Sequence, residues 1–319
     1  MLRSSLICLS QAEWARRMVT SWGFARRAAS RFIAGEELDD AIKVVKILNN
    51  NNINATLDHL GEHTSTPDKA RQATQEIIDV LKRIETEGVR SNVSIKLTQI
   101  GLAVDEELCV ENLHRILDTA VALNTFVRID MEDSQWVDKT LQIFRDAQEH
   151  CSCGNVGIVI QSYLFRSEED VNQLLKTGSR IRLCKGAYKE PEEIAFPEKS
   201  DVDANYDLIV KQLLSGSMEN GMPTIKKDGK IPLIPAIATH DEKRIDFTKK
   251  ELENSRFPKE AIEFQMLHGI RRDLQEELAK EGFPVRVYVP YGSEWYPYFT
   301  RRLAERPANL WFFISNLFR

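Results

Sequence analysis

Short apolar or β-branched runs recur along the chain, and each is bounded by polar or glycine-containing segments. Segments with helical spacing separate most of these runs, for example from Asp68 to about Gly88, and from Ser167, a predicted helix cap, to Gly178. Eight runs have the length of a β-strand: NATLD (54–58), VSIKL (93–97), FVRID (126–130), GIVI (157–160), RIRLC (180–184), IPAIAT (234–239), IEFQML (262–267) and VRVYV (285–289). The pattern predicts eight strands alternating with helices.

This alternation favours an α/β fold, a (β/α)8 TIM-like barrel. The rival is a doubly wound open sheet, but the count of eight and the absence of GxGxxG after the first strand favour the barrel. A length of 319 residues fits one barrel with additional helices. We therefore expect N-terminal helices in residues 1–50, packed on the barrel, and a single barrel unit in residues 51–319.

Composition narrows the class of protein. Charged residues make up 29% and hydrophobic residues 42% of the chain, and the net charge of −5 shows no basic excess for binding nucleic acid. Five scattered cysteines do not form a disulfide framework and indicate a reducing compartment. The apolar tail LWFFISNLF (310–318) is too short to span a bilayer; it docks on the barrel or touches lipid.

Polar residues stand at the carboxyl ends of the predicted strands, where barrels place their chemistry. Seven of the eight strands contribute: Lys96; Asp130 with Glu132; Gln161; Arg182 and Lys185; Thr239 and His240; Gln265; and Tyr288. Single members have structural explanations, such as an ion pair between Lys96 and Asp130 or a core role for His240. A buried polar cluster of this size nevertheless costs free energy unless a ligand or a complete network satisfies it.

The end of the chain carries a second signal. YVPYG begins at Tyr288, and a helix from a cap at Ser293 to about Glu305 would place Tyr298, Arg301, Arg302 and Glu305 on one face. Paired arginines match a carboxylate bidentately, so this face predicts a small carboxylic acid as ligand. The alternative is a solvated helix face.

Several familiar chemistries lack their motifs. There is no HxH or HExxH for a metal, no GxSxG for a serine hydrolase and no Walker loop. We therefore expect no metal site. Lys96 and Lys185 at strand ends suit a Schiff-base aldolase acting on a small carboxylic acid, which is the alternative enzyme class.

The chain resembles monofunctional bacterial proline dehydrogenase. The similar strings follow one another in order over nearly the whole chain: VSIKLTQIGL (93–102), RIDMED (128–133), IQSYL (160–164), IRLCKGAYKEP (181–191), ATHD (238–241), FQMLHGIR (264–271) and YVPYG through RRLAERPAN (288–309). The resemblance implies an FAD enzyme with a distorted barrel and a final helix over the catalytic rim. It also implies oxidation of L-proline to Δ1-pyrroline-5-carboxylate, with hydride passing from C5 to flavin N5 and electrons passing to a membrane quinone.

The resemblance assigns roles to individual residues. Arg301, Arg302 and Lys96 would hold the proline carboxylate, Tyr288 and Leu267 would wall the ring with Tyr188 close by, and Asp130 would brace the network. The residues implied for FAD are Gln161, Arg182, Cys184, Lys185, Gly186, Ala187, Thr239, His240, Gln265 and Glu305. Arg182 would stabilise the anion formed when hydride arrives. The base for the amine proton stays open between Asp130, Glu132 and solvent.

Partners and location follow from the same resemblance. A quinone acceptor requires only peripheral access, so we expect a cytoplasmic protein, compatible with peripheral contact at the inner face of the cell membrane. Pyrroline-5-carboxylate dehydrogenase is the expected downstream partner. The segment 189–207 after Tyr188 leaves the catalytic rim and is a candidate lid.

One segment departs from the family pattern. Residues 217–234 (SMENGMPTIKKDGKIPLI) are extra, and their Asp228-Gly229 turn signal predicts a short β-hairpin. The insert follows a helix and precedes a strand, so it should lie at the amino-terminal face of the barrel and be catalytically silent.

Overall fold

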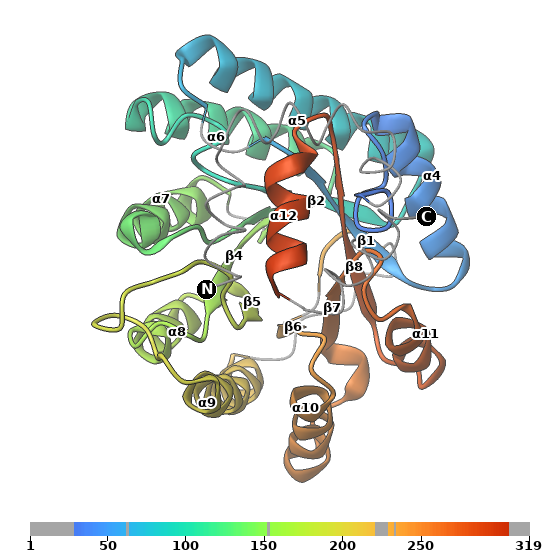
Figure 1. The fold of residues 1–319 in the computed structure, drawn as a ribbon, viewed down its shortest axis with the longest axis vertical. Coiled ribbons are helices and arrows are strands. Elements are labelled where there is room, and N and C mark those ends of the chain that lie inside the picture. The colour runs from blue at the N-terminus through green and yellow to red at the C-terminus, as the bar shows by residue number, and fades with distance from the viewer. Residues whose placement is uncertain (1–28, 62–63, 152–153, 221–228, 233, 306–319) are drawn as a thin grey trace, which may run out of the picture.

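Eight parallel strands close into a barrel in the computed structural model, which describes residues 29–61, 64–151, 154–220, 229–232 and 234–305. The strands pair in sequence order, and β8 closes the barrel on β1 (Figure 1). They are β1 (Asn54–His59), β2 (Ser91–Ile95), β3 (Val127–Ile129), β4 (Val156–Gln161), β5 (Arg180–Cys184), β6 (Ala236–Ala238), β7 (Glu263–Leu267) and β8 (Val285–Tyr291). The predicted (β/α)8 barrel is confirmed.

Helices surround the barrel, but the last one takes a different place (Figure 1). The helices are α4 (Leu38–Asn50), α5 (Pro67–Glu87), α6 (Glu106–Ala122), α7 (Val137–His150), α8 (Ser167–Lys176), α9 (Lys199–Glu219), α10 (Glu242–Ser255), α11 (Arg272–Lys280) and α12 (Trp295–Glu305), with short 3-10 turns at Ser134–Trp136 and Lys259–Ala261. Helix α4 packs outside β1 and β8, whereas α12 lies across the barrel opening. The barrel is distorted in that α4, and not the last helix, packs outside β8.

Local sequence sets the ends of α5. Thr66 accepts a hydrogen bond from the backbone of Lys69 at 3.3 Å and Pro67 follows it, while Gly88 ends α5 in the left-handed conformation. The prediction that Ser167 caps α8 is wrong. Ser167 is the first residue of the helix, and its hydroxyl donates to the carbonyl oxygen of Gln161 at 2.5 Å, which ties the helix start to the end of β4.

The interior of the barrel is more polar than the strand sequences suggest. Outward-facing strand residues such as Val93 and Ile95 belong to the apolar core under the helices. Inside, the Thr56 hydroxyl donates to Asn92 at 2.6 Å, and Arg128 and Arg286 are each only 1% exposed. The barrel interior therefore holds hydrogen-bonded polar and charged side chains in place of the usual branched apolar layers.

The described part of the 217–234 insert closes the amino-terminal end of this interior. The carbonyl oxygen of Gly229 accepts from Arg286 Nη2 at 2.7 Å, and that of Lys230 accepts from Asn92 Nδ2 at 2.7 Å. This is the face that the sequence predicted for the insert. The hairpin itself falls mainly on 221–228, which lie outside the described residues.

Gly229 is expected to be a sensitive position. Its φ is +64°, and an added Cβ would lie 2.4 Å from Asn54 Oδ1. Gly178 has the same φ, but an added Cβ there would meet nothing within 4 Å. We expect Gly178→Ala to cost about 1–2 kcal/mol of unfolding free energy for the left-handed backbone alone, and Gly229→Ala to cost clearly more because a contact must also shift. Urea denaturation of both variants measures the difference. Equal losses of unfolding free energy would contradict tight packing around Gly229 at the amino-terminal end of the barrel.

Candidate active site

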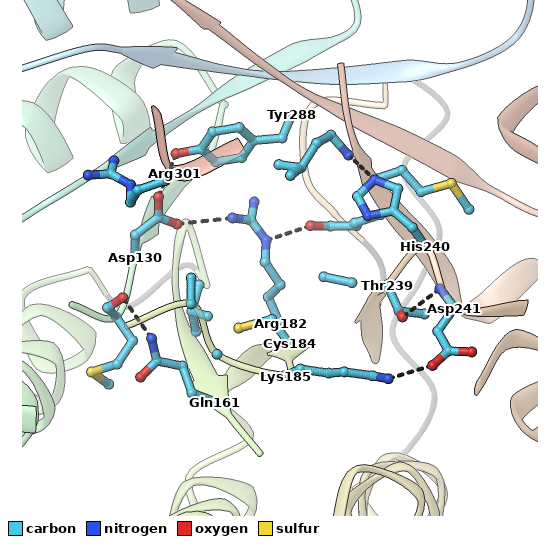
Figure 2. Close-up of a pocket in the computed structure, with 18 of the residues that line it drawn as sticks. Asp130, Gln161, Arg182, Cys184, Lys185, Thr239, His240, Asp241, Tyr288 and Arg301 are labelled. Carbon is cyan, nitrogen blue, oxygen red and sulfur yellow. Dashed lines mark hydrogen bonds and ion pairs between the residues drawn. The ribbon is translucent and has the colours of Figure 1, made fainter. Parts of the chain in front are cut away.

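A cavity of about 870 Å³ opens at the carboxyl ends of the strands, beneath α12 (Figure 2). It is lined by every residue that the sequence predicted for the site except Glu132 and Glu305. Glu305 is the last residue of α12, and its side chain lies outside the part of the chain that the structure describes. The volume lies within the range of small-molecule and cofactor sites.

Asp130, directly after β3, is the hub of the polar wall (Figure 2). Its Oδ1 accepts from Ser94 Oγ at 2.8 Å and from Arg182 Nη1 at 3.0 Å, and its Oδ2 accepts from the Tyr288 hydroxyl at 2.7 Å. Burial, reinforced by the Asp130 carboxylate, raises the pKa of Tyr288 well above its ordinary value. Tyr288 therefore stays protonated and holds Asp130 in place as a donor.

Lys96 has a closer partner than the predicted one. Its Nζ lies 3.3 Å from Asp58 Oδ1 and 3.7 Å from Asp130 Oδ2. Asp58 is 1% exposed and lines the cavity, although it was not among the predicted strand-end residues. The signal was present, because Asp58 is the last residue of the NATLD run and stands at the same rim as the others.

Arg182 spans the cavity wall from β5. Its Nε donates to Gln265 Oε1 on β7 at 2.5 Å, and its guanidinium carbon lies 5.5 Å from the centre of the Tyr288 ring. Cys184, two residues further along β5, also lines the cavity, and burial raises the pKa of its thiol to about 12. The wall there consists of a fixed cation and a neutral thiol.

Lys185 is held by two carboxylates that the sequence analysis did not place. Its Nζ donates to Asp203 of α9 at 2.5 Å and to Asp241 at 2.6 Å, just before α10. Asp241 was visible in the ATHD string, whereas Asp203 lies inside the segment predicted as a lid. These contacts fix the outer end of the cavity.

The loop after Lys185 is closely packed. Gly186 has a φ of +113°, and a Cβ there would lie 2.4 Å from the Tyr163 ring, so both the backbone conformation and Tyr163 require glycine at this position. Ala187 and Tyr188 follow it along the cavity wall. Of the segment predicted as a lid, 189–207, only the part before Lys199 is a loop, because α9 begins at Lys199. The remaining loop is bound to the β4–α8 connection by a bridge between Leu164 and Ala195.

Helix α12 turns its polar face into the cavity. Tyr298, Arg301 and Arg302 all line it, as the spacing predicted, and Arg302 is 8% exposed, with its guanidinium carbon 5.0 Å from the Tyr298 ring centre. A solvated helix face is therefore excluded for Arg302. Beside this face, Phe299 packs against Phe32 at a ring distance of 6.1 Å.

Three more predicted residues, His240, Thr239 and Gln161, also line the cavity. His240 Nε2 accepts from the backbone N–H of Leu267 at 2.9 Å, and Thr239 Oγ1 accepts from the backbone of Asp241 at 3.1 Å. Gln161 Nε2 donates to the carbonyl oxygen of Met131 at 3.3 Å, while its Oε1 is buried without a partner. A buried acceptor without a partner favours a ligand that brings an N–H group.

His268, directly after β7, is expected to lower the free energy of unfolding as the pH becomes acidic. Burial lowers its pKa from 6.5 to about 4, and Arg272 acts in the same direction. The unfolded chain therefore binds a proton as pH falls below about 6.5, while the folded chain binds it only near pH 4. Stability is complete above pH 6.5 and falls by on the order of 3 kcal/mol by pH 4 through this group.

The check is the pH dependence of unfolding by urea. His268→Gln should flatten the curve between pH 4 and 6.5, whereas His150→Gln, at a more exposed histidine paired with Asp118, serves as the control. A His268→Gln curve with the slope of the unmutated protein would rule out a neutral His268.

Among the described residues, no three histidine, cysteine, aspartate or glutamate side chains gather in a way that suits a metal ion. Within the same part of the chain, no helix combines the length and apolar character needed to cross a bilayer. The apolar tail 310–318 lies outside the described residues.

Comparison with known proteins gives a consistent result. The family model described as Proline dehydrogenase matches residues 41–314. Proline dehydrogenase 2 of Bacillus subtilis (strain 168) is 42% identical over 316 residues, which cover 99% of this chain and 98% of that protein. Proline dehydrogenase of Deinococcus radiodurans is 40% identical over 295 residues, covering 91% of this chain and 90% of that protein.

Among solved structures, the fold resembles proline utilization A (PutA) from Bdellovibrio bacteriovorus, inactivated by N-propargylglycine. The TM-score is 0.79 and the sequence identity 27%, and the match covers 88% of this chain. It covers 33% of the PutA chain, so this chain spans about a third of that larger protein.

Proposed function

Because the chain belongs to the proline dehydrogenase family, we propose that it oxidises L-proline to Δ1-pyrroline-5-carboxylate with FAD as its cofactor. The observation that carries the proposal is the meeting of two groups in one cavity. The arginine pair of α12 faces inward there, together with the strand-end cluster around Arg182 and Gln161. The first group suits an amino-acid carboxylate, and the second suits a ring system with N–H groups and developing negative charge.

The substrate carboxylate would be bound by Arg301, Arg302 and Lys96. Charge-assisted hydrogen bonds from these cations fix the orientation of proline, and orientation is the main contribution that the protein makes to hydride transfer. Tyr288 and Leu267 would wall the ring, with Tyr188 beside it. Both tyrosine and leucine offer apolar surface to the methylene groups of proline.

The residues of the cavity fit a flavin. Gln161 Oε1 is a buried acceptor that a flavin N–H would satisfy, and Arg182 is a fixed cation where the reduced ring gains negative charge. FAD, when bound, supplies the acceptor at N5 for the hydride that leaves proline C5. The residues proposed to hold it are Gln161, Arg182, Cys184, Lys185, Gly186, Ala187, Thr239, His240, Gln265 and Glu305.

The amine proton is assigned to solvent. Glu132 is 2% exposed, does not line the cavity, and accepts hydrogen bonds from the backbone and hydroxyl of Thr98. Both oxygens of Asp130 already accept hydrogen bonds, so its carboxylate braces Arg182 and Tyr288. Neither carboxylate is then well suited as the base.

Two further parts of the proposal are the electron acceptor and the next reaction. A membrane quinone would reoxidise the flavin, with the protein in the cytoplasm and in peripheral contact with the membrane. The cyclic imine product would pass to pyrroline-5-carboxylate dehydrogenase.

The absorption spectrum of the purified protein tests the proposal. We expect flavin bands that bleach when L-proline is added anaerobically. The competing aldolase would be colourless and would be trapped on a lysine by borohydride with its substrate. Lys96 and Lys185 are both engaged with carboxylates, which disfavours a free amine at either. A protein without flavin bands after reconstitution with FAD would refute the proposal.

A further inference from the structure

A chain of hydrogen bonds runs through the barrel interior from its amino-terminal end to the cavity. Its members are Arg286 on β8, Glu263 and Gln265 on β7, and Arg182 on β5. Their exposed fractions are 1%, 1%, 4% and 6%, respectively. Of these four, Arg182 and Gln265 line the cavity. Glu263 and Arg286 do not line it, and their hydrogen bonds reach it through Gln265 and Arg182.

Every contact in the chain is short and directional. Arg286 donates through Nε and Nη2 to the two oxygens of Glu263, at 2.8 and 3.1 Å, which is a bidentate ion pair. Glu263 Oε1 also accepts from Gln265 Nε2 at 2.6 Å. Gln265 Oε1 then accepts from Arg182 Nε at 2.5 Å.

The orientation of the Gln265 amide is determined by its two neighbours. Arginine can only donate, and an ionised carboxylate can only accept. The amide oxygen must therefore face Arg182, and the amide nitrogen must face Glu263. A flipped amide would set donor against donor and acceptor against acceptor in a buried site, where unmet hydrogen bonds are costly.

Arg182 is held from two sides of the barrel. Its Nη1 donates to Asp130 after β3, and its Nε donates to Gln265 on β7. To reach β7 its side chain crosses β6, where Ala236 is in register with both Arg182 and Glu263. A methyl group leaves room for this crossing. Two anchors on different strands fix the plane of the guanidinium.

We propose that Glu263 is a positioning residue for Arg182: through the Gln265 amide it sets the plane of the guanidinium that faces the cofactor. The inference rests on the proposed function, since it concerns the cation placed beside the flavin. It assigns Arg286 the task of keeping Glu263 ionised and oriented. A purely structural role for this ion pair would affect folding without affecting the cofactor.

Two double variants separate these roles. Glu263→Gln/Arg286→Met and Glu263→Met/Arg286→Met both remove the ion pair, both change the interior charge equally, and have side chains of similar size. The difference that matters for the Gln265 amide is that glutamine offers an oxygen to Gln265 Nε2 and methionine does not. Replacing a buried ion pair as a whole is tolerated far better than breaking it, so both variants should fold.

The measurements are the FAD dissociation constant, the flavin midpoint potential, kcat with L-proline and Tm. We expect the glutamine variant to stay within about threefold of the unmutated protein in FAD affinity. The methionine variant should bind FAD at least about tenfold more weakly, with a lower potential and kcat reduced by about 100-fold, at a similar Tm. Equal values for the two variants in all three cofactor measurements would overturn the proposal.

If the double variants do not fold, Glu263→Asp tests the same idea. It keeps the charge beside Arg286 and withdraws the carboxylate from Gln265 by one methylene group, so FAD affinity and kcat should each fall by about three- to tenfold. FAD affinity and kcat unchanged in Glu263→Asp would also overturn it. A failure of the proposed function is distinct, because the unmutated protein would then lack FAD binding or proline oxidation. In that case crystal structures of the variants still report whether the Arg182 guanidinium has turned.

Discussion

Replacing Arg302 with methionine is expected to lower kcat/KM for L-proline by about 2–5 kcal/mol, roughly 30-fold to several thousand-fold, mainly through a higher KM. Arg302 is 8% exposed and projects from α12 into the cavity, where it would meet the substrate carboxylate in a desolvated setting. Arg301→Met should have an effect in the same direction, and a smaller one, because Arg301 is more exposed. Steady-state kinetics over a wide proline range measures both.

The controls separate charge from geometry. Arg302→Lys keeps the charge but loses the bidentate fork, so an intermediate loss is expected. Arg83→Met removes a surface arginine paired with Asp39 and Glu87 and should leave the kinetics unchanged. FAD content and Tm should be close to the unmutated values in all four variants. If kcat/KM were unchanged in both Arg301→Met and Arg302→Met, the carboxylate would be bound elsewhere.

Replacing Arg182 with methionine is expected to reduce kcat by about 100-fold or more and to lower the flavin midpoint potential. A fixed cation beside the reduced ring stabilises its negative charge, and methionine removes that charge while keeping most of the volume. The variant also releases one hydrogen bond from Asp130, although Ser94 and Tyr288 still donate to that carboxylate. Some loss of FAD on purification should accompany the change.

Arg128→Met is the matched control for this experiment. Arg128 is also buried inside the barrel, and its Nη1 contacts carbonyl oxygens of Ile158 and Arg180. Removing it takes away one interior cation without touching the cavity wall, so FAD content should be retained and any potential shift should be smaller. A normal FAD content, potential and turnover in Arg182→Met would rule out its proposed role.

The elements of this fold were predictable because their causes are local. Period-two and period-3.6 patterns mark strands and helices. The Thr66 side chain and Pro67 start α5, and the left-handed backbone of Gly88 ends it. The location of the site followed from a general property of the fold, since parallel strands bring their carboxyl ends to one rim. The same property applies to Asp58, which ends the first predicted strand, NATLD.

Pairing between side chains could not be predicted in the same way. The structural explanation for Lys96 was an ion pair with Asp130; that pair is present at 3.7 Å, but Asp58 on the other neighbouring strand lies closer, at 3.3 Å. Lys185 meets Asp203 and Asp241, which come from two different helix starts. Such choices depend on differences of less than 1 Å in side-chain reach, and the strand pattern contains no information at that scale.

The sequence by itself determined the strand count, the barrel, the rim that carries the chemistry and, through its motifs, the resemblance to proline dehydrogenases. Each of these depends on short-range patterns or on residue identity. Only the tertiary structure decided that Glu263 and Arg286 connect the amino-terminal end of the barrel interior to Arg182. The reason is physical: barrel closure brings residues from distant segments within hydrogen-bonding distance, and burial makes those contacts obligatory.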